Sequence, residues 1–137
     1  MSKISESSYS VIIIEDNVLI AQEVLELLEP AGFQPIGQFQ TYLSALKSLD
    51  DLSPSFCVLD LDLGGSMYSG FGPGEEGRRL LAVLAHIQVP TVVYSAFTRM
   101  QHQLERIHPN MIAVDKIEPA ERVIEALGEL RDANHQA

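Results

Sequence analysis

Short apolar runs rich in β-branched residues alternate along this chain with stretches of helical periodicity, and this alternation constrains the fold more than any other feature. The runs with the length and composition of strands cover residues 9–14, 33–37, 55–60, 91–95 and 111–114. Helical patterns cover residues 17–30, 41–49, 75–87, 98–107 and 119–132. Several strand runs are almost continuously apolar, which is typical of parallel strands covered on both faces. Five strand–helix units therefore predict an α/β fold with a doubly wound, five-stranded parallel sheet.

The size and composition of the chain indicate one domain. Its 137 residues, 46% of them hydrophobic, are enough to bury a core. We predict a single domain over residues 1–137, with an ordered core over about 8–131 and frayed ends. No apolar run approaches the roughly 20 residues that cross a bilayer, and the polar start lacks the apolar segment of a secretory signal. With a single cysteine, Cys57, these features predict a cytoplasmic protein that does not insert into membranes.

The charge of the chain argues against nucleic acid as a partner. The formal net charge is −10, and the nine lysine and arginine residues are scattered along the sequence. Binding to nucleic acid depends on a cluster of cations that displaces the counterions of the phosphate backbone. Because the sequence shows no such cluster, we expect no direct contact with DNA or RNA.

Polar residues close the apolar runs, and in a parallel sheet these ends meet at one edge, where ligands bind. The first run is followed by Glu15 and Asp16, the third ends in Asp60, the fourth ends in Ser95, and Lys116 follows the fifth. Two unit charges about 4 Å apart repel by roughly 4 kcal/mol at an effective dielectric constant near 20. Three carboxylates at one edge therefore favour a bound cation, and a set of oxygen ligands with room for a phosphate favours Mg²⁺.

The same residues suit the transfer of a phosphoryl group. A carboxylate such as Asp60 can act as a nucleophile and form an acyl phosphate. A lysine and a hydroxyl beside it, here Lys116 and Ser95, stabilise the oxygens of a phosphoryl group during in-line transfer.

In order and spacing, Glu15–Asp16, Asp60, Ser95–Ala96 and Lys116 resemble the motifs of the receiver domain of two-component response regulators. The resemblance covers essentially the whole chain. It implies a (βα)5 flavodoxin-like fold with strand order 2-1-3-4-5. It also implies that Asp60 is the phosphoacceptor, that the donor is a sensor histidine kinase or a histidine phosphotransfer protein, and that the chain catalyses only its own phosphorylation and dephosphorylation and is otherwise not an enzyme.

The resemblance also implies which groups form the site. The expected Mg²⁺ ligands are three carboxylates and one backbone carbonyl, those of Glu15, Asp16, Asp60 and Asp62 (the carbonyl). The expected phosphate-binding groups are a hydroxyl, a backbone amide and a lysine, those of Ser95, Ala96 and Lys116.

Two residues depart from the pattern of this family. Ile117 follows the lysine where the family usually has a proline with a cis bond, and a cis bond before isoleucine would cost roughly 2.5–4 kcal/mol. We therefore expect this loop to be trans or differently set. Ala113 stands where the family has its aromatic switch residue. Tyr94 and Phe97 are the aromatic residues that we consider as substitutes.

The loop over residues 64–77 is rich in glycine and longer than the family's usual one, and Gly64 replaces a common proline. Its segment GPGEEG matches a dinucleotide-binding motif. That motif should follow its strand directly, however, and two glutamates beside it would repel a pyrophosphate. We interpret the loop as a flexible lid beside Asp60, in which Met67, Tyr68 and Phe71 gate access or meet a partner.

The first helix carries two apolar stripes. One is expected to face the core and consists of Ile20, Val24, Leu27, Leu28 and Ala31. The other is expected to face outward and to dock the kinase or phosphotransfer protein, and it consists of Val18, Ala21 and Leu25.

Two alternatives to a phosphorylated receiver stay open. The first is a receiver-like adaptor that no longer takes up a phosphoryl group, which Ala113 and Ile117 motivate. The second is a phosphatase of the haloacid-dehalogenase type, because Asp60 and Asp62 form a D-x-D pair.

If the chain is a receiver, we expect its output to be a protein–protein contact on the fourth helix, fifth strand and fifth helix, or the phosphoryl group itself. The sequence does not decide whether the chain forms a homodimer on that surface.

Overall fold

The computed structural model describes residues 9–63 and 71–135. The strands are β1 (Tyr9–Ile14), β2 (Phe33–Phe39), β3 (Phe56–Leu59), β4 (Thr91–Ser95) and β5 (Met111–Asp115). The α-helices are α2 (Val18–Leu28), α3 (Tyr42–Asp51), α4 (Glu75–His86), α5 (Thr98–Glu105) and α6 (Ala120–His135), and a 3₁₀ turn, η1 (Glu29–Ala31), follows α2. None of the helices in the described ranges has the length and apolar character needed to cross a bilayer.

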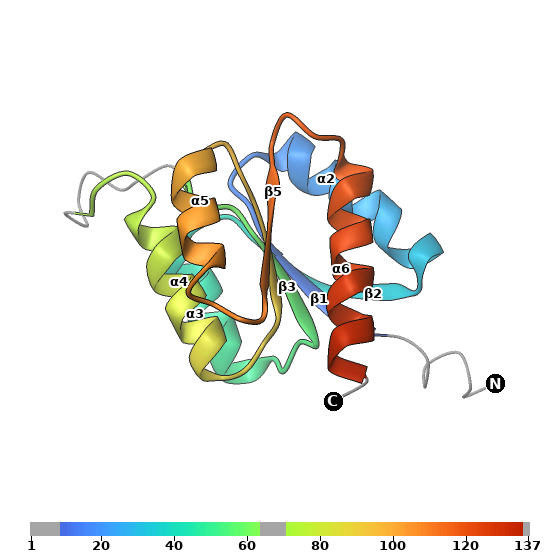
Figure 1. The fold of residues 1–137 in the computed structure, drawn as a ribbon. Coiled ribbons are helices and arrows are strands. Elements are labelled where there is room, and N and C mark those ends of the chain that lie inside the picture. The colour runs from blue at the N-terminus through green and yellow to red at the C-terminus, as the bar shows by residue number, and fades with distance from the viewer. Residues whose placement is uncertain (1–8, 64–70, 136–137) are drawn as a thin grey trace.

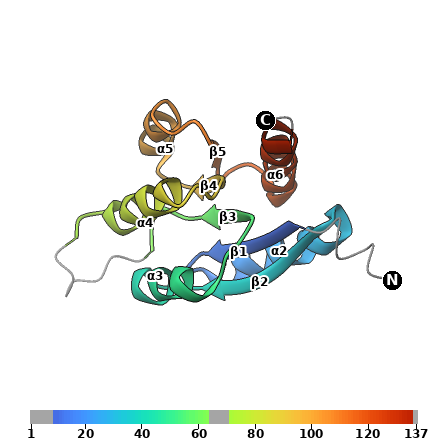
Figure 2. The same ribbon diagram turned by 90° about the horizontal axis from the view of Figure 1, so that it is seen from below.

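The five strands form one sheet in the order β2-β1-β3-β4-β5, and every neighbouring pair is parallel. Figures 1 and 2 show this sheet at the centre of the molecule. The edge strand β2 contains Pro35, which lacks a backbone donor and is tolerated at an edge, and the register with β1 shifts between Val11 and Ile12. The predicted fold class and strand order are confirmed.

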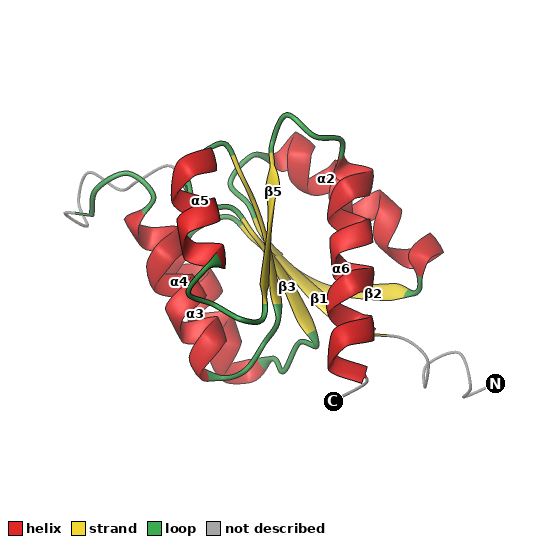
Figure 3. Cartoon of the chain, viewed as in Figure 1, coloured by secondary structure: helices red, strands yellow, loops and turns green. Residues whose placement is uncertain are grey.

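Helices cover both faces of the sheet, as Figure 3 shows. Helices α2 and α6 pack on one face, where the core includes Val11 and Ile13 of β1. Helices α3, α4 and α5 pack on the other face, where Ile12 and Ile14 contribute to a second core. Successive residues of β1 thus point to opposite faces, and both faces exclude water. This explains the continuous apolar runs in the sequence.

The outward stripe predicted on the first helix is wrong for two of its three members. Ala21 is 0% exposed and lies in the core beneath α2, and Leu25 is half-buried and packs against the same core. Only Val18, at 54%, is exposed. The fully buried face of α2 is instead formed by Ala21, Val24 and Leu28. Gln22, Glu23 and Glu26 form the exposed, polar side of this helix, and Ala21 lies opposite them, which the prediction did not take into account.

The ends of two helices show how local sequence sets the boundaries. The side chain of Asn17 accepts hydrogen bonds from the amides of Leu19 and Ile20, and so caps the start of α2. Gly32 ends the following 3₁₀ turn with a φ of 91°, a conformation that favours glycine. The last helix, predicted to end at residue 132, continues to His135.

Candidate functional site

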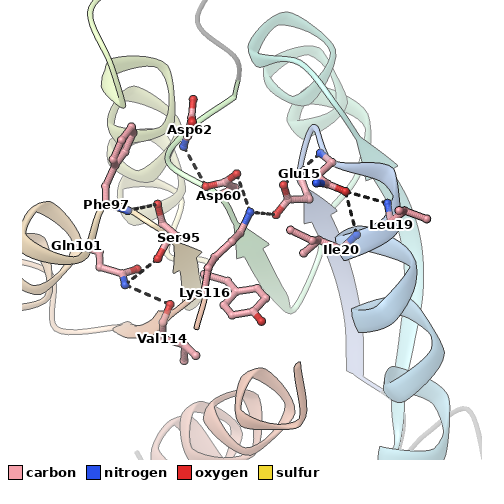
Figure 4. A network of polar contacts seen from close by, with 12 residues as sticks. Glu15, Leu19, Ile20, Asp60, Asp62, Ser95, Phe97, Gln101, Val114 and Lys116 are labelled. Carbon is pink, nitrogen blue, oxygen red and sulfur yellow. Dashed lines mark hydrogen bonds and ion pairs between the residues drawn. The ribbon is translucent and has the colours of Figure 1, made fainter. Parts of the chain in front are cut away.

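The strands carry the predicted site residues to one edge of the sheet. Glu15 follows β1, Asp60 follows β3, Ser95 ends β4, and Lys116 follows β5. Because all five strands run in the same direction, these positions lie at the same edge. Figure 4 shows the side chains of Asp60 and Glu15 directed toward the amino group of Lys116. The convergence predicted from the ends of the apolar runs is therefore present.

Lys116 bridges two buried carboxylates. Its Nζ lies 2.7 Å from Glu15 Oε1 and 3.0 Å from Asp60 Oδ2, and both acids are almost inaccessible to solvent. Burial acts to lower the pKa of Lys116, but its hydrogen bond to Glu15 and the charge of Asp60 outweigh this effect and raise the pKa. The lysine is therefore held in its charged form, in the position where it can neutralise a developing anion.

The carboxylates outnumber the cation that holds them. Burial and the charge of Asp60 raise the pKa of Glu15 to about 8, against the lowering effect of Lys116. Burial, together with the charges of Asp60 and Asp62, also raises the pKa of Asp16. The ionised forms of Glu15 and Asp16 are thus disfavoured, because one lysine does not offset the burial and repulsion that act on them. A divalent cation would relieve this repulsion.

The geometry of the acids suits such an ion. Glu15, Asp16 and Asp60 each offer a carboxylate oxygen, and these three oxygens lie within 4.8 Å of one another. Glu15 and Asp60 are buried while Asp16 is exposed, so one side of the cluster is open to solvent. Hard oxygen donors with an open side fit Mg²⁺, which retains several waters and binds phosphates. The donor set therefore fits the ion that the resemblance implies.

The backbone of Asp62 contacts the candidate phosphoacceptor, Asp60. Its amide donates a hydrogen bond to Asp60 Oδ1 at 3.0 Å, and its side chain is exposed. This bond folds the segment after β3 around Asp60 and fixes the orientation of the Asp60 carboxylate. The carbonyl of Asp62 as a metal ligand stays a prediction.

The hydroxyl of Ser95 lies on the other half of the site and is fully buried. Its Oγ accepts a hydrogen bond from the amide of Phe97 at 3.1 Å, and its carbonyl accepts one from the amide of Lys116 at 3.1 Å. The second bond links the end of β4 to the loop that carries the lysine. Ala96 is exposed beside them. Phosphate binding by Ser95 and by the Ala96 amide stays a prediction.

The substitution at Ile117 does not displace the lysine. No cis peptide bond occurs in the described residues, so the bond before Ile117 is trans, one of the two expected outcomes. Lys116 nevertheless reaches both Glu15 and Asp60. Ile117 itself is 95% exposed and lies beside the site.

Tyr94 is the better placed of the two aromatic residues considered as substitutes for the missing ring at Ala113. Its hydroxyl donates to the carbonyl of Glu118 at 2.8 Å, and its ring centroid lies 5.9 Å from Lys116 Nζ. Phe97 instead precedes α5 and packs, partly buried, in the core beneath that helix. Tyr94 thus contacts both the lysine and the loop between β5 and α6, whereas Phe97 packs in the core beneath α5.

Gln101 of α5 is a central residue that we did not identify from the sequence. It is fully buried, and its Nε2 donates to the carbonyls of Ser95 (3.2 Å) and Val114 (3.1 Å) and to Asp115 Oδ1 (2.6 Å). Its Oε1 has no hydrogen-bond partner in the described part of the chain. Figure 4 shows this amide beneath Ser95. In the sequence, Gln101 lies four residues after Phe97 in a predicted helix. This helical spacing places it on the same face as Phe97 and could have indicated a buried glutamine.

Gly77 of α4 is a second residue whose role the sequence did not reveal. A Cβ atom at this position would lie 2.3 Å from the Cα of Leu61, well inside contact distance. Helix α4 therefore packs directly against the backbone that follows Asp60. The third glycine of the GPGEEG segment thus has a packing role, and the rejected dinucleotide motif is not needed to explain it.

The predicted lid is only partly described. Residues 64–70, and with them Gly64, Met67 and Tyr68, lie outside the described residues. Phe71 packs edge-on against Tyr42 of α3, with ring centroids 5.6 Å apart. The guanidinium carbon of Arg79, on α4, lies 4.4 Å from the centroid of the Phe71 ring. Phe71 thus contacts helices α3 and α4, and its role in gating access or meeting a partner stays a prediction.

Comparison with known proteins identifies the fold. No protein family profile matches the chain, and no curated protein matches it. Among solved structures, the signal receiver domain of a modulated diguanylate cyclase from Desulfovibrio desulfuricans matches with a TM-score of 0.73, 20% identity and coverage of 94% of this chain and 98% of that one. The response regulatory domain of MrkE from Klebsiella pneumoniae matches with a TM-score of 0.75, 22% identity and coverage of 93% and 99%.

A third similar structure is the receiver (REC) domain of the PhyR response regulator from Erythrobacter litoralis, with a TM-score of 0.72, 21% identity and coverage of 92% of both chains. All three similarities extend over nearly the full length of both chains. The resemblance that the sequence motifs indicated is confirmed at the level of the fold, and the chain has the fold of response regulator receiver domains.

Proposed function

We propose that the chain accepts a phosphoryl group on Asp60 from a phosphohistidine of a sensor kinase or phosphotransfer protein. One observation carries this proposal: a buried aspartate at the end of a central strand is bonded to Lys116 and lies within a cluster of two further acids. The receiver fold supports the same reading.

The transfer step requires a nucleophile and a way to stabilise the phosphoryl oxygens. An oxygen of Asp60 attacks phosphorus, the phosphorus–nitrogen bond breaks, and its electron pair stays on the imidazole. The product is an acyl phosphate. Lys116, already directed at Asp60 Oδ2, moves its charge to a phosphoryl oxygen, and the hydroxyl of Ser95 and the amide of Ala96 donate to the others.

Mg²⁺ belongs to this proposal because the donor set fits it. Glu15, Asp16 and Asp60 would hold the ion through their carboxylates, together with the carbonyl of Asp62. The ion would neutralise the charge that gathers on the phosphoryl oxygens and the acids. Lys116 and the fixed Asp60 carboxylate orient the reacting oxygen, while burial of Glu15 and Asp60 limits access of water.

Loss of the phosphoryl group completes the cycle. Water attacks phosphorus, the bond to Asp60 breaks, and the carboxylate and inorganic phosphate are released. The chain would then catalyse only its own phosphorylation and dephosphorylation, in the cytoplasm. Its output would be a protein contact or onward transfer of the phosphoryl group.

Exposed apolar residues beside the site indicate where the phosphodonor docks. Val18 and Leu19, 54% and 77% exposed, begin helix α2, and Ile117, 95% exposed, follows the site lysine. These three residues flank the acids from two different elements. We propose that Leu19 and Ile117, together with Val18 of the predicted stripe, contact the donor protein around its phosphohistidine.

Intact-protein mass spectrometry tests the proposal. The wild-type chain is incubated with Mg²⁺ and acetyl phosphate beside two matched variants, Asp60→Asn and Asp62→Asn. We expect one phosphoryl adduct that depends on Mg²⁺, is absent from Asp60→Asn and is retained in Asp62→Asn, because that change leaves the carbonyl of residue 62 in place.

Other outcomes would select the alternatives. No adduct with any small phosphodonor, in a chain whose circular dichroism is native, would contradict the proposal and favour the adaptor. Steady hydrolysis of varied phosphomonoesters, lost in both variants, would favour the phosphatase.

A further inference from the structure

A groove of about 470 Å³ lies between helices α4 and α5 and is unrelated to the acid cluster. Its lining residues are Arg78, Phe97, Thr98, Arg99, Met100 and Gln103. Figures 1 and 2 both show the two helices side by side on the same face of the sheet. The groove begins next to the candidate site, because the amide of Phe97 donates to Ser95 Oγ.

The groove contains unpaired positive charge on an acidic protein. Elsewhere in the described chain, Arg79, Arg122 and Arg131 form ion pairs with neighbouring acids. Arg78 and Arg99 are exposed, and their side chains form no hydrogen bond or ion pair with the residues that the structure describes; Arg78 acts on Glu75 only through its charge, which helps to lower the pKa of that acid. Guanidinium groups bind carboxylates in bidentate fashion. Arg78 on α4 and Arg99 on α5 line opposite sides of the groove, so an acidic ligand between the helices could pair with both.

The N-terminus of helix α5 adds to the positive charge of the groove. No side chain caps this helix and its first turn contains no acidic residue; instead Arg99 lies in that turn. Helix N-termini favour negative charge, since the unpaired amides and the helix dipole are positive there. A cation at this position is unfavourable to the isolated helix, and an anion in the groove would interact favourably with both the arginine and the helix end.

The floor of the groove is apolar and tightly supported. Phe97 and Met100 are partly buried against the core. Gly74, which precedes α4 with a φ of 76°, approaches them so closely that a Cβ would lie 2.9 Å from Met100 Sδ and 3.1 Å from the Phe97 ring. The two apolar side chains are therefore held in place before any ligand arrives, which favours binding without reorganisation.

We propose that this groove binds an acidic segment of a partner protein. An apolar side chain of that segment lies on Phe97 and Met100, and its carboxylates pair with Arg78 and Arg99. Charge complementarity identifies this occupant, because the two arginines are unpaired in a chain of net charge −10. Two copies of so acidic a chain repel one another, which favours a different protein over self-association. This binding does not require phosphorylation of Asp60.

A library of short random peptides, displayed and selected on the full-length chain, tests the proposal. Selected peptides are expected to be enriched in aspartate and glutamate and to contain an aromatic residue or leucine. They should bind the wild-type chain about tenfold or more tightly than the double variant Arg78→Glu/Arg99→Glu, and more weakly as salt rises. In ¹⁵N spectra they should shift the amides of residues 78 and 97–103.

A matched double variant, Lys47→Glu/Arg106→Glu, makes the same change in net charge at two other exposed cations. At a salt concentration that screens the overall charge of the protein, it should bind the selected peptides within about twofold of the wild-type affinity. The milder Arg78→Gln/Arg99→Gln variant should also lose affinity, which guards against a folding defect in the first. The proposal is overturned if no peptide is selected, if the peptides show no acidic excess, or if both glutamate double variants lose affinity equally.

Discussion

The two halves of the candidate site are built differently. The acid half, at the ends of β1 and β3, consists of side chains directly bonded to one lysine: Glu15 and Asp60 both contact Lys116. In the hydroxyl half, at the ends of β4 and β5, the backbone is fixed by two side-chain hydrogen bonds. Gln101 donates to the carbonyl of Ser95, and Tyr94 donates to the carbonyl of Glu118. The acid half fits the sequence pattern of receivers, whereas the hydroxyl half departs from it at Ala113 and Ile117. The two halves thus differ in what holds their side chains: direct ion pairs in the acid half and buried hydrogen bonds in the hydroxyl half.

Replacing the shared cation should give the largest effect. In Lys116→Met, two buried carboxylates lose their common partner and the phosphoryl oxygens lose a charged donor, so the rate of phosphoryl uptake from acetyl phosphate should fall by roughly 10²–10³-fold. Lys47→Met, on the exposed face of α3, is the control and should react at the wild-type rate. Equal rates in all three proteins would show that Lys116 takes no part in the transfer.

Removing the buried amide should damage the hydroxyl half without touching the acids. Gln101→Leu leaves the carbonyls of Ser95 and Val114 and the carboxylate of Asp115 without this donor, which should lower the free energy of unfolding by about 3 kcal/mol. Urea denaturation measures this change against Gln103→Leu, an exposed residue of the same helix. If Gln101→Leu is as stable as its control, the amide does not hold β4 and β5 together.

The close approach of α4 to the acid half can be tested at Gly77. A methyl group there would overlap the backbone of Leu61, so Gly77→Ala should destabilise the fold by about 2 kcal/mol and slow phosphoryl uptake by displacing the segment after Asp60. Gly128→Ala, where the nearest atom to a new Cβ lies at 3.6 Å, should be neutral or stabilising. A stable and fully reactive Gly77→Ala protein would contradict the packing that we describe.

The smallest expected effect concerns the loop after β5. Tyr94→Phe removes the hydrogen bond to the Glu118 carbonyl and keeps the ring beside Lys116, so stability should fall by only about 1 kcal/mol. Hydrogen exchange should become faster at the amides of Ile117 and Glu118 and stay unchanged on α2. Faster exchange over the whole chain would indicate a global loss of stability, and would contradict a local role of the Tyr94 hydrogen bond in fixing this loop.

The sequence predicted those parts of the molecule that depend on local pattern. Continuous apolar strands and the polar residues that end them were sufficient for the sheet and for the convergence of Glu15, Asp60 and Lys116. Ala21 of the first helix was assigned to the wrong face, although it lies opposite the polar side formed by Gln22, Glu23 and Glu26. Gln101 and Gly77 were missed because their roles depend on contacts outside their own helices: Gln101 with the carbonyls of Ser95 and Val114, and Gly77 with the backbone of Leu61.

The most direct test of the central claim is to locate the phosphoryl group by chemistry that marks its carboxylate. Reduction of the phosphorylated chain with borohydride converts an aspartyl phosphate to homoserine, and peptide mass mapping then identifies the position. We predict homoserine at position 60 alone, and only after phosphorylation in the presence of Mg²⁺. Homoserine at position 62 or at another carboxylate, or none in a chain that carries a phosphoryl adduct, would contradict the assignment of Asp60 as the acceptor.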